Sequence, residues 1–481
     1  YKREGKDPNE QKIAAPKITP IVTNRDSQSE FLSEIQTSQV QPIEPVFVDY
    51  KKDMSQFEAQ PGIDVLYKKN ETNDIFTLIY VFNTGTENDP ALNLAFNYLS
   101  YLGTDKMTAE EIASEMYDIA CSFYMNAGAN QSSIQITGLS ENMGKAMEIV
   151  EGLIAGAKPD EAILENCKAD MLKSRADAKL NQSRCFGALQ RYLFYGGDFI
   201  RRTTLTDPAL QALTSEQLLA KIGGLMGKQH EVLYYGPQKE TEIKSALAEH
   251  HKVAADLQPL EKKFSALLPT DANKVVLAQY DAKQLYYLQF SNRGEKFDVA
   301  ADPEITLYNE YFGGGMNTIV FQEMREARGL AYSAWATLAT PSNANGDYSY
   351  YAFIATQNDK MQKAVEAFDD IINNMPESEK AFGIAKEALV SRLRTERTVK
   401  DGVLWSYLRA RDLGLDAPRD KQIFEKVQSM TLDDVKAAQQ KWVKGRKYVY
   451  GILGDIQDLD LNYLKTLGPI QTVSQEEIFG Y

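Results

Sequence analysis

Short apolar runs alternate with longer amphipathic segments along most of the chain, beginning near Val46. Apolar residues at every second position predict strands, and apolar residues that recur with the helical period predict helices. In the first part of the chain this pattern predicts strands at residues 46–50, 65–67, 76–82, 134–137 and 231–235, with another near Phe123. The helices expected between them cover residues 90–103, 108–120, 141–155 and 160–193, with a loop at Gly196-Gly197.

The same order of elements recurs in the second part of the chain. Strands predicted at Val275–Gln279 and Leu285–Ser291 are followed by Asp302-Pro303, which starts a helix just as Asp89-Pro90 does in the first part. Aspartate suits the cap position and proline suits the first helical position. Two such copies predict an α+β fold of two homologous domains, each an antiparallel-rich sheet packed against helices.

The predicted organisation is a linker over residues 1–41, a first domain over 42–262 and a second domain over 263–481. Residues 6–41 are polar and contain three prolines, which is typical of a linker. A short helical pattern near Phe31 is the one exception. The chain begins at Tyr1 without a methionine or a signal sequence, so we expect the linker to follow the N-terminal half of a longer protein.

Composition narrows the classes of function. The 481 residues carry a formal net charge of −14, which argues against binding to nucleic acid or to an anionic membrane surface. No apolar run reaches the roughly 20 residues that a membrane-spanning helix requires, so membrane insertion is not expected. Three cysteines are too few for a disulfide framework.

The stretch Tyr311–Trp335, YFGGGMNTIVFQEMREARGLAYSAW, carries the most specific pattern in the chain. Gly313–Gly315 are expected to end the preceding helix, because glycine accepts the left-handed conformation that closes a helix. Asn317 or Thr318 then offers an N-cap oxygen to a second helix, which ends at Gly329. A strand is expected directly after this glycine.

Residues Phe321–Ser333 read Phe-Gln-Glu-x-Arg-Glu-x-Arg-Gly-Leu-Ala-Tyr-Ser. This pattern, together with the glycine-rich turn before it, resembles the C-terminal domains of the insulinase/pitrilysin zinc peptidases, the mitochondrial processing peptidase group included. The family often has Ser-Ser-Arg after the glycines, where this chain has Asn317, Thr318 and Ile319. The resemblance implies paired domains that face each other across a chamber. By analogy with bacterial relatives it also implies a periplasmic or otherwise exported protein.

Active members of this family bind zinc with His-x-x-Glu-His on a helix, in which the glutamate is the general base, and with a more distant glutamate. Aligned on Gly103-Thr104, the two histidine positions here hold Leu94 and Tyr98, and the glutamate position holds Asn97. The region of the distant ligand, Lys173–Ala176, has no carboxylate. We therefore expect no metal or cofactor in this chain, and the resemblance implies zinc in the missing N-terminal half.

The chain has three histidines, and each has a structural interpretation. His230 opens an apolar run that predicts a strand, with Tyr234 where a His-Glu-x-x-His zinc motif would have its second histidine. His250 and His251 end a helix, where they suit the negative end of the helix dipole. Metal binding is the alternative for both sites.

Arg325 and Tyr332 are the candidate catalytic residues. The resemblance implies that they reach into the zinc site of another domain, bind the substrate backbone and help to stabilise the oxyanion of the tetrahedral intermediate. Guanidinium and phenol groups are suitable donors to developing negative charge. The alternative is a surface arginine that pairs with Glu326 or Glu323, beside a tyrosine packed in the sheet.

The first copy keeps the tyrosine, as Tyr124, but has Tyr117 at the arginine position, so only the second copy has both donors. The chain is expected to be the non-catalytic C-terminal half of a zinc metallopeptidase that hydrolyses peptides in an enclosed chamber. It would be inactive alone, with the N-terminal half and a peptide substrate as partners. The alternative is a catalytically dead family member that serves as a structural or partner-binding subunit.

An aromatic stripe begins at the end of the helices predicted over residues 160–193. The stripe is expected to lie in the core, with contact to a peptide as the alternative. Its residues are Tyr192, Phe194, Tyr195 and Phe199.

Overall fold

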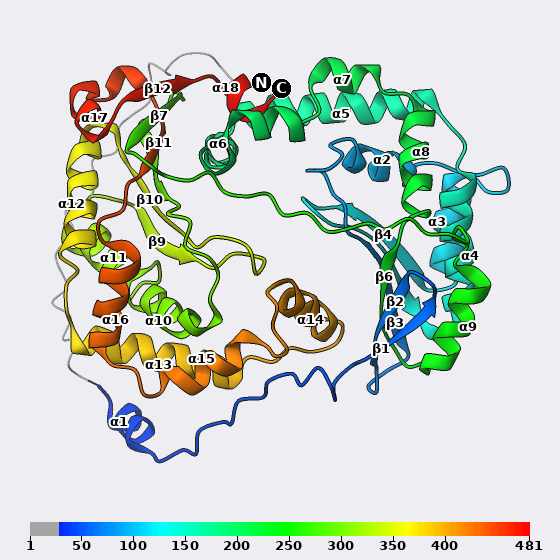
Figure 1. Cartoon of the computed structure of the whole chain (residues 1–481), viewed down its shortest axis with the longest axis horizontal. Helices are drawn as coiled ribbons and strands as arrows, with labels where there is room; N and C mark the ends of the chain where they lie inside the picture. Colours follow the sequence, from blue (N-terminus) through cyan, green and yellow to red (C-terminus); the bar gives the residue numbers. More distant parts are fainter. Residues whose placement is uncertain (1–27) are drawn as a thin grey trace, which may run out of the picture. The chain divides into compact units, whose positions relative to one another are not determined.

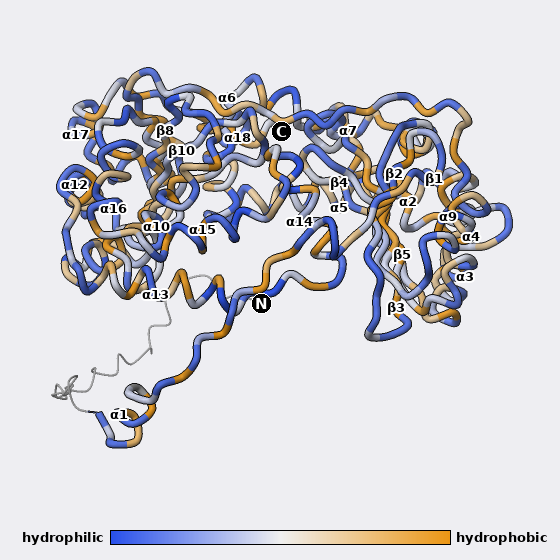
Figure 2. The backbone as a smooth tube through the Cα atoms, turned by 60° about the horizontal axis from the view of Figure 1, so that its bottom comes forward, coloured by the Kyte–Doolittle hydropathy of each residue, from blue (hydrophilic) through white to orange (hydrophobic). Residues whose placement is uncertain are grey.

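The computed structural model describes residues 28–481, and the chain divides into two compact units, residues 1–44 and 45–481. The described part of the first unit contains α1 (Glu30–Thr37), which Ser29 caps by accepting a hydrogen bond from the backbone N–H of Leu32. The helix expected near Phe31 is therefore present. Figure 2 shows hydrophobic and hydrophilic stretches alternating along the chain. Among residues 28–481, no helix combines the length and apolar character needed to cross a membrane.

The unit of residues 45–481 contains two mixed sheets of six strands each (Figure 1). Their strand orders are β1-β2-β6-β3-β5-β4 and β12-β7-β11-β8-β10-β9. The first sheet comprises β1 (Ser55–Gln60), β2 (Ile63–Lys69), β3 (Ile75–Phe82), β4 (Cys121–Ala127), β5 (Ser132–Leu139) and β6 (His230–Gly236). The second sheet comprises β7 (Lys274–Gln279), β8 (Gln284–Ser291), β9 (Ser333–Ala339), β10 (Ser349–Gln357), β11 (Val449–Gly454) and β12 (Ile470–Val473).

The two sheets have the same strand order and strand directions in their central parts. In the first sheet β6 is parallel to β2 and antiparallel to β3, and in the second β11 is parallel to β7 and antiparallel to β8. The sheets differ at one edge, where β1 is antiparallel to β2 but β12 is parallel to β7. At the other edge β4 and β9 occupy equivalent places. The predicted α+β fold with an internal repeat is confirmed.

Helices pack against both sheets. Those in the first part of the chain are α2 (Leu92–Leu99), α3 (Ala109–Asp118), α4 (Met143–Gly156), α5 (Glu161–Lys179), α6 (Gln182–Thr203), α7 (Asp207–Ala212), α8 (Ser215–Leu225) and α9 (Glu240–His250). Those in the second part are α10 (Asp302–Phe312), α11 (Ile319–Phe321), α12 (Met361–Asn373), α13 (Glu379–Thr395), α14 (Gly402–Asp412), α15 (Arg419–Val427), α16 (Leu432–Ala438), α17 (Leu461–Leu467) and α18 (Gln475–Phe479).

Helix α6 lies in the sequence between β5 and β6 of the first sheet but packs on the second sheet (Figure 1). Its apolar face places Leu189 and Leu193 in one buried cluster with Leu288 and Leu453 of β8 and β11. The loop expected at Gly196-Gly197 is wrong, because the helix only kinks at Gly196 and continues to Thr203. Gly196 has φ +82°, a left-handed conformation that changes the direction of the chain without ending the helical path.

The strand expected at residues 46–50 is also wrong. Phe47 and Tyr50 lie in irregular chain and pack against helices, Phe47 on Phe424 of α15 and Tyr50 on Tyr407 of α14. Their alternation reflects contact with two different helices rather than a pleated strand. The first strand of the sheet is instead β1, whose mostly polar residues do not stand out in the sequence because β1 is an edge strand.

Candidate functional site

The glycine-rich turn after α10 fits closely against β9. The backbone N–H of Gly313 donates to Asn309, and a Cβ on Gly313 would lie 2.3 Å from the Asn309 carbonyl oxygen. A Cβ on Gly314 would lie 2.8 Å from Cβ of Trp335. None of Gly313–Gly315 has a positive φ, so the expected left-handed helix ending is wrong here. Gly313 and Gly314 are required instead by their close packing against Asn309 and Trp335.

The helix that follows the turn is wider than an α-helix. After one α-helical turn at Ile319–Phe321, residues Gln322–Ala327 form a π-helix, and Gly329 (φ +58°) follows it as predicted. Thr318 occupies the N-cap position, but its hydroxyl donates to the Gly315 carbonyl at 2.7 Å and makes no cap bond, so the predicted N-cap oxygen is wrong. Single π-helical turns occur often at functional sites, because they re-aim the side chains that they carry.

Arg325 lies on this π-helix, and its guanidinium stacks on two rings. The guanidinium carbon is 5.0 Å from the ring centroid of Phe321 and 5.0 Å from that of Tyr332. Such cation–π contacts hold a guanidinium plane parallel to an aromatic face without using its N–H donors. Arg325 Nε also lies 3.7 Å from Glu326 Oε1, with both side chains largely exposed, and an ion pair of this kind contributes little.

Tyr332 stands at the start of edge strand β9. Its backbone N–H donates to the Ala355 carbonyl of β10, which fixes the main chain, while the residue remains 73% exposed. The tyrosine is therefore not packed in the sheet, as the alternative interpretation of this residue supposed. The two candidate residues, seven positions apart, form one exposed pair of hydrogen-bond donors at the sheet edge.

The first copy has no such pair. Tyr117 on α3 and Tyr124 on β4 are 84% and 64% exposed. Neither ring has a cation stacked on it within the described residues. Two phenols without a guanidinium cannot offer the same charged donor set.

The residues that the sequence aligns with the family's zinc ligands, Leu94 and Tyr98, are core residues on α2. Leu94 and Tyr98 are both buried, and the Tyr98 hydroxyl lies 2.7 Å from Ser215 Oγ and accepts from the backbone N–H of Asp160 at 2.8 Å. Asn97 is exposed and carries no carboxylate. The residues on this helix do not fit a zinc ion. Nor does any group of three His, Cys, Asp or Glu side chains in residues 28–481 suit a metal ion.

Two of the histidines are in contact in the buried interior beside the first sheet, and the sequence did not predict this contact. His230 Nε2 lies 2.8 Å from His251 Nε2, and His251 Nδ1 lies 2.5 Å from Glu151 Oε1, with all three side chains buried. The ring of Tyr80 packs against His251, with the ring centroids 4.1 Å apart and the planes tilted by 32°. Burial, followed by the neighbouring His251, lowers the pKa of His230 to about 4. These residues lie far apart in the sequence, so no local motif signals their contact.

Comparison with known proteins finds a family match over part of this chain. Residues 230–389 match the peptidase M16 inactive domain. An uncharacterized zinc protease of Streptomyces coelicolor is 22% identical over 266 residues, which are 51% of this chain and 56% of that protein. This chain therefore spans little more than half the length of that relative.

Solved structures share the fold over most of this chain. The peptidase M16 inactive domain from Pseudomonas fluorescens superposes with a TM-score of 0.65 at 18% identity, over 84% of this chain and 98% of its own. The periplasmic protease PqqL from Escherichia coli superposes with a TM-score of 0.63 at 14% identity, over 92% of this chain and 49% of its own. The predicted resemblance is thus confirmed: residues 230–389 match the peptidase M16 inactive domain, and the chain is similar in sequence to zinc proteases.

Proposed function

We propose that this chain is the non-catalytic C-terminal half of a zinc peptidase and supplies Arg325 and Tyr332 to a peptide-hydrolysing site. The zinc ligands would belong to an N-terminal half, and the two halves would enclose the peptide. On this proposal residues 42–262 and 263–481 are the two peptidase-like domains and residues 1–41 are the linker. The observation that carries the proposal is the stacked pair of Arg325 and Tyr332, 5.0 Å apart and exposed at a sheet edge.

The chemistry of the pair suits a peptide carbonyl. The stack on Phe321 and Tyr332 orients the guanidinium and leaves its N–H donors free for an oxygen acceptor. The phenol of Tyr332 adds a neutral donor beside it. Donors that are held in place before the reaction stabilise negative charge as it develops on the substrate, which is the main contribution of an oxyanion site.

The test is a reconstitution of activity from two polypeptides. This chain and a zinc-binding N-terminal half would be assayed separately and mixed, on a quenched unstructured peptide, with and without a zinc chelator. We expect hydrolysis only in the mixture and none with chelator. Arg325→Ala or Tyr332→Phe should lower kcat by about 100-fold to 1,000-fold, the usual cost of one oxyanion donor.

A matched control comes from the same helix. Arg328 pairs with Glu323 and Asp370 and does not stack on Tyr332, so Arg328→Ala should keep near-normal activity in the mixture. Equal losses in the Arg325 and Arg328 variants would contradict a specific role for the pair.

A structural role is the second candidate, because core residues Leu94 and Tyr98 replace zinc ligands and the matched domain is described as inactive. An N-terminal half that binds this chain tightly but yields no hydrolysis in the mixture would favour this candidate. Normal activity with both Arg325→Ala and Tyr332→Phe would favour it as well.

A further inference from the structure

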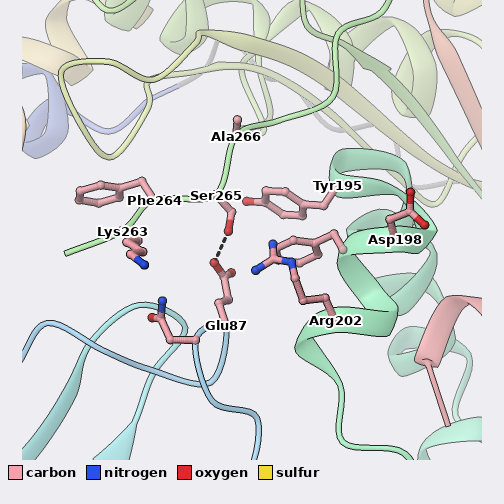
Figure 3. A pocket seen from close by; sticks show the side chains of 10 residues that line it. Glu87, Tyr195, Asp198, Arg202, Lys263, Phe264, Ser265 and Ala266 are labelled. Atoms are coloured by element: carbon pink, nitrogen blue, oxygen red, sulfur yellow. Dashed lines mark hydrogen bonds between the residues drawn. The ribbon is translucent and has the colours of Figure 1, made fainter. Parts of the chain in front are cut away.

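Two adjoining cavities that share Glu87 form a groove at the end of edge strand β4. The first has a volume of about 480 Å³ and is lined by the loop at Glu87, by the second half of α6 and by the chain near Lys263 (Figure 3). The second, of about 500 Å³, reaches from Glu87 to Arg191 and to residues 127–129. We call both together the Glu87 groove.

The kink of α6 builds one wall of the groove. Because Gly196 turns the helix, Tyr195 before the kink and Phe199 after it stack on each other at 4.5 Å. The guanidinium carbons of Arg191 and Arg202 lie 5.0 Å and 5.5 Å from the Phe199 ring centroid. Phe199 is buried, as expected, and Tyr195 is half-buried, and both line the first cavity with their polar and cationic neighbours.

In the described part of the chain, three of the four cations that line the groove lack acidic partners, whereas the fourth, Arg175, pairs with Asp207. Within residues 28–481, no carboxylate oxygen lies within 4.0 Å of a charged nitrogen of Arg191, Arg202 or Lys263. Arg191 instead donates to the Thr203 hydroxyl at 2.7 Å. Such a cluster is unusual in a chain with a net charge of −14, in which an acidic partner is seldom far away.

Both acidic residues of the groove, Glu87 and Asp198, have polar partners. Glu87 accepts a hydrogen bond from the Ser265 hydroxyl at 2.5 Å, which Figure 3 shows as a dashed line. Asp198 pairs with Arg201. The groove therefore presents three cations without ion-pair partners, beside the single carboxylate of Glu87 and the ring of Tyr195, to a ligand that carries negative charge and apolar groups.

The position of the groove identifies the ligand class. Edge strand β4 ends at Ala127, which lines the second cavity, and the backbone N–H groups of Thr86 and Glu87 donate to the carbonyls of Gly128 and Ala129. An extended peptide that follows the edge of the sheet would pass into the groove. The net charge of the whole chain disfavours a nucleic acid or an anionic membrane as the source of negative charge.

We propose that the Glu87 groove binds an acidic segment of an extended peptide, with carboxylates on Arg191, Arg202 and Lys263 and an apolar side chain on Tyr195 and Phe199. This binding does not depend on Arg325 or Tyr332, or on catalysis. It is therefore measurable on this chain alone.

The test is fluorescence anisotropy with labelled peptides and the unmodified chain. The probe is a C-terminally amidated ten-residue peptide in which glutamates alternate with apolar and aromatic residues, compared with the same peptide carrying glutamine at every glutamate. We expect the acidic peptide to bind at least tenfold more tightly than its glutamine form, and to bind more weakly as salt is added.

Variants distinguish peptide binding in the groove from non-specific electrostatic attraction to the protein surface. Arg202 and Lys263 are exposed, so the double variant Arg202→Gln/Lys263→Gln should fold normally and weaken binding about fivefold to tenfold. Glu87→Gln removes a repelling charge and should strengthen binding. Arg184 is exposed on α6 outside the groove, so Arg184→Gln should leave the affinity for the peptide unchanged.

Three results would overturn the proposal. Equal affinity for the glutamate and glutamine peptides would remove the charge argument. Unchanged binding by the Arg202→Gln/Lys263→Gln variant would place the site elsewhere. Binding that requires a free C-terminal carboxylate, whatever the side chains, would make the ligand a peptide terminus rather than an acidic segment.

Discussion

At the scale of single residues, buried titratable groups make the stability of this protein depend on pH. His230 is 4% exposed, and its pKa is lowered to about 4, first by burial and then by His251. The folded state therefore keeps His230 neutral, whereas the unfolded chain takes up a proton below pH 6.5. Stability is consequently lost as the pH falls from 6.5 to 4, and this loss is complete below pH 4.

The variant His230→Gln tests this account. Between pH 7 and pH 4 its unfolding free energy should decrease less than that of the wild type, by on the order of 3 kcal/mol. Urea denaturation at several pH values measures this slope. An unchanged slope in the His230 variant would show that the imidazole is protonated in the folded protein.

Asp369 on α12 makes stability depend on pH in the opposite direction to His230. Burial raises its pKa to about 6, and its main polar contact is the amide of Gln289, 3.4 Å away. The folded state thus favours the protonated carboxyl, and stability falls as the pH rises from 3.8 to 6. Asp369→Asn should raise the unfolding free energy above pH 6 by roughly 1–3 kcal/mol and have little effect near pH 4. Equal gains at both pH values would contradict this account.

At the scale of elements, the kink of α6 depends on one backbone conformation. Gly196 has φ +82°, and a Cβ there would also lie 3.0 Å from Leu268. Gly196→Ala should cost about 1–2 kcal/mol of stability, and it should weaken peptide binding because it disturbs Tyr195 and Phe199. Gly187→Ala, in the straight part of α6 with no atom within 4 Å of its new Cβ, should be neutral or stabilising by up to about 1 kcal/mol in thermal unfolding.

The elements also show what local sequence can predict. The repeated order of strands and helices follows from apolar periodicity, and the exposed pair of Arg325 and Tyr332 lies within one contiguous motif. Contacts between distant segments were not predictable. The cluster of His230 with His251 and Glu151, and the packing of Phe47 and Tyr50 on helices, depend on residues far along the chain.

At the scale of the unit of residues 45–481, α14 connects the second part of the chain to the first sheet. Leu404 and Leu408 share a buried cluster with Ile79 and Leu233 of that sheet. Arg411 of α14 also pairs with Glu231 of β6, with one N–O distance of 2.8 Å. This contact crosses the repeat, so the two sheet-and-helix halves should unfold together.

Leu404→Ala tests this coupling. The cavity should cost about 2–5 kcal/mol and should separate one unfolding transition into two, because the halves lose part of their contact. Leu461→Ala, at an exposed position, should preserve a single transition. Calorimetry distinguishes these outcomes, and a single transition in the Leu404 variant would show that other contacts couple the halves.

The packing of α6 on the second sheet has a consequence for proteolysis. Leu189 and Leu193 are fully enclosed by residues that follow the connection of residues 251–273 in the sequence, and α18 covers α6 from the other end of the chain. A protease that cuts only within this connection would therefore leave two fragments that remain associated and co-migrate in gel filtration. Each fragment expressed alone would expose part of an apolar core and would tend to aggregate. Co-expression of both pieces would restore a nicked but native protein.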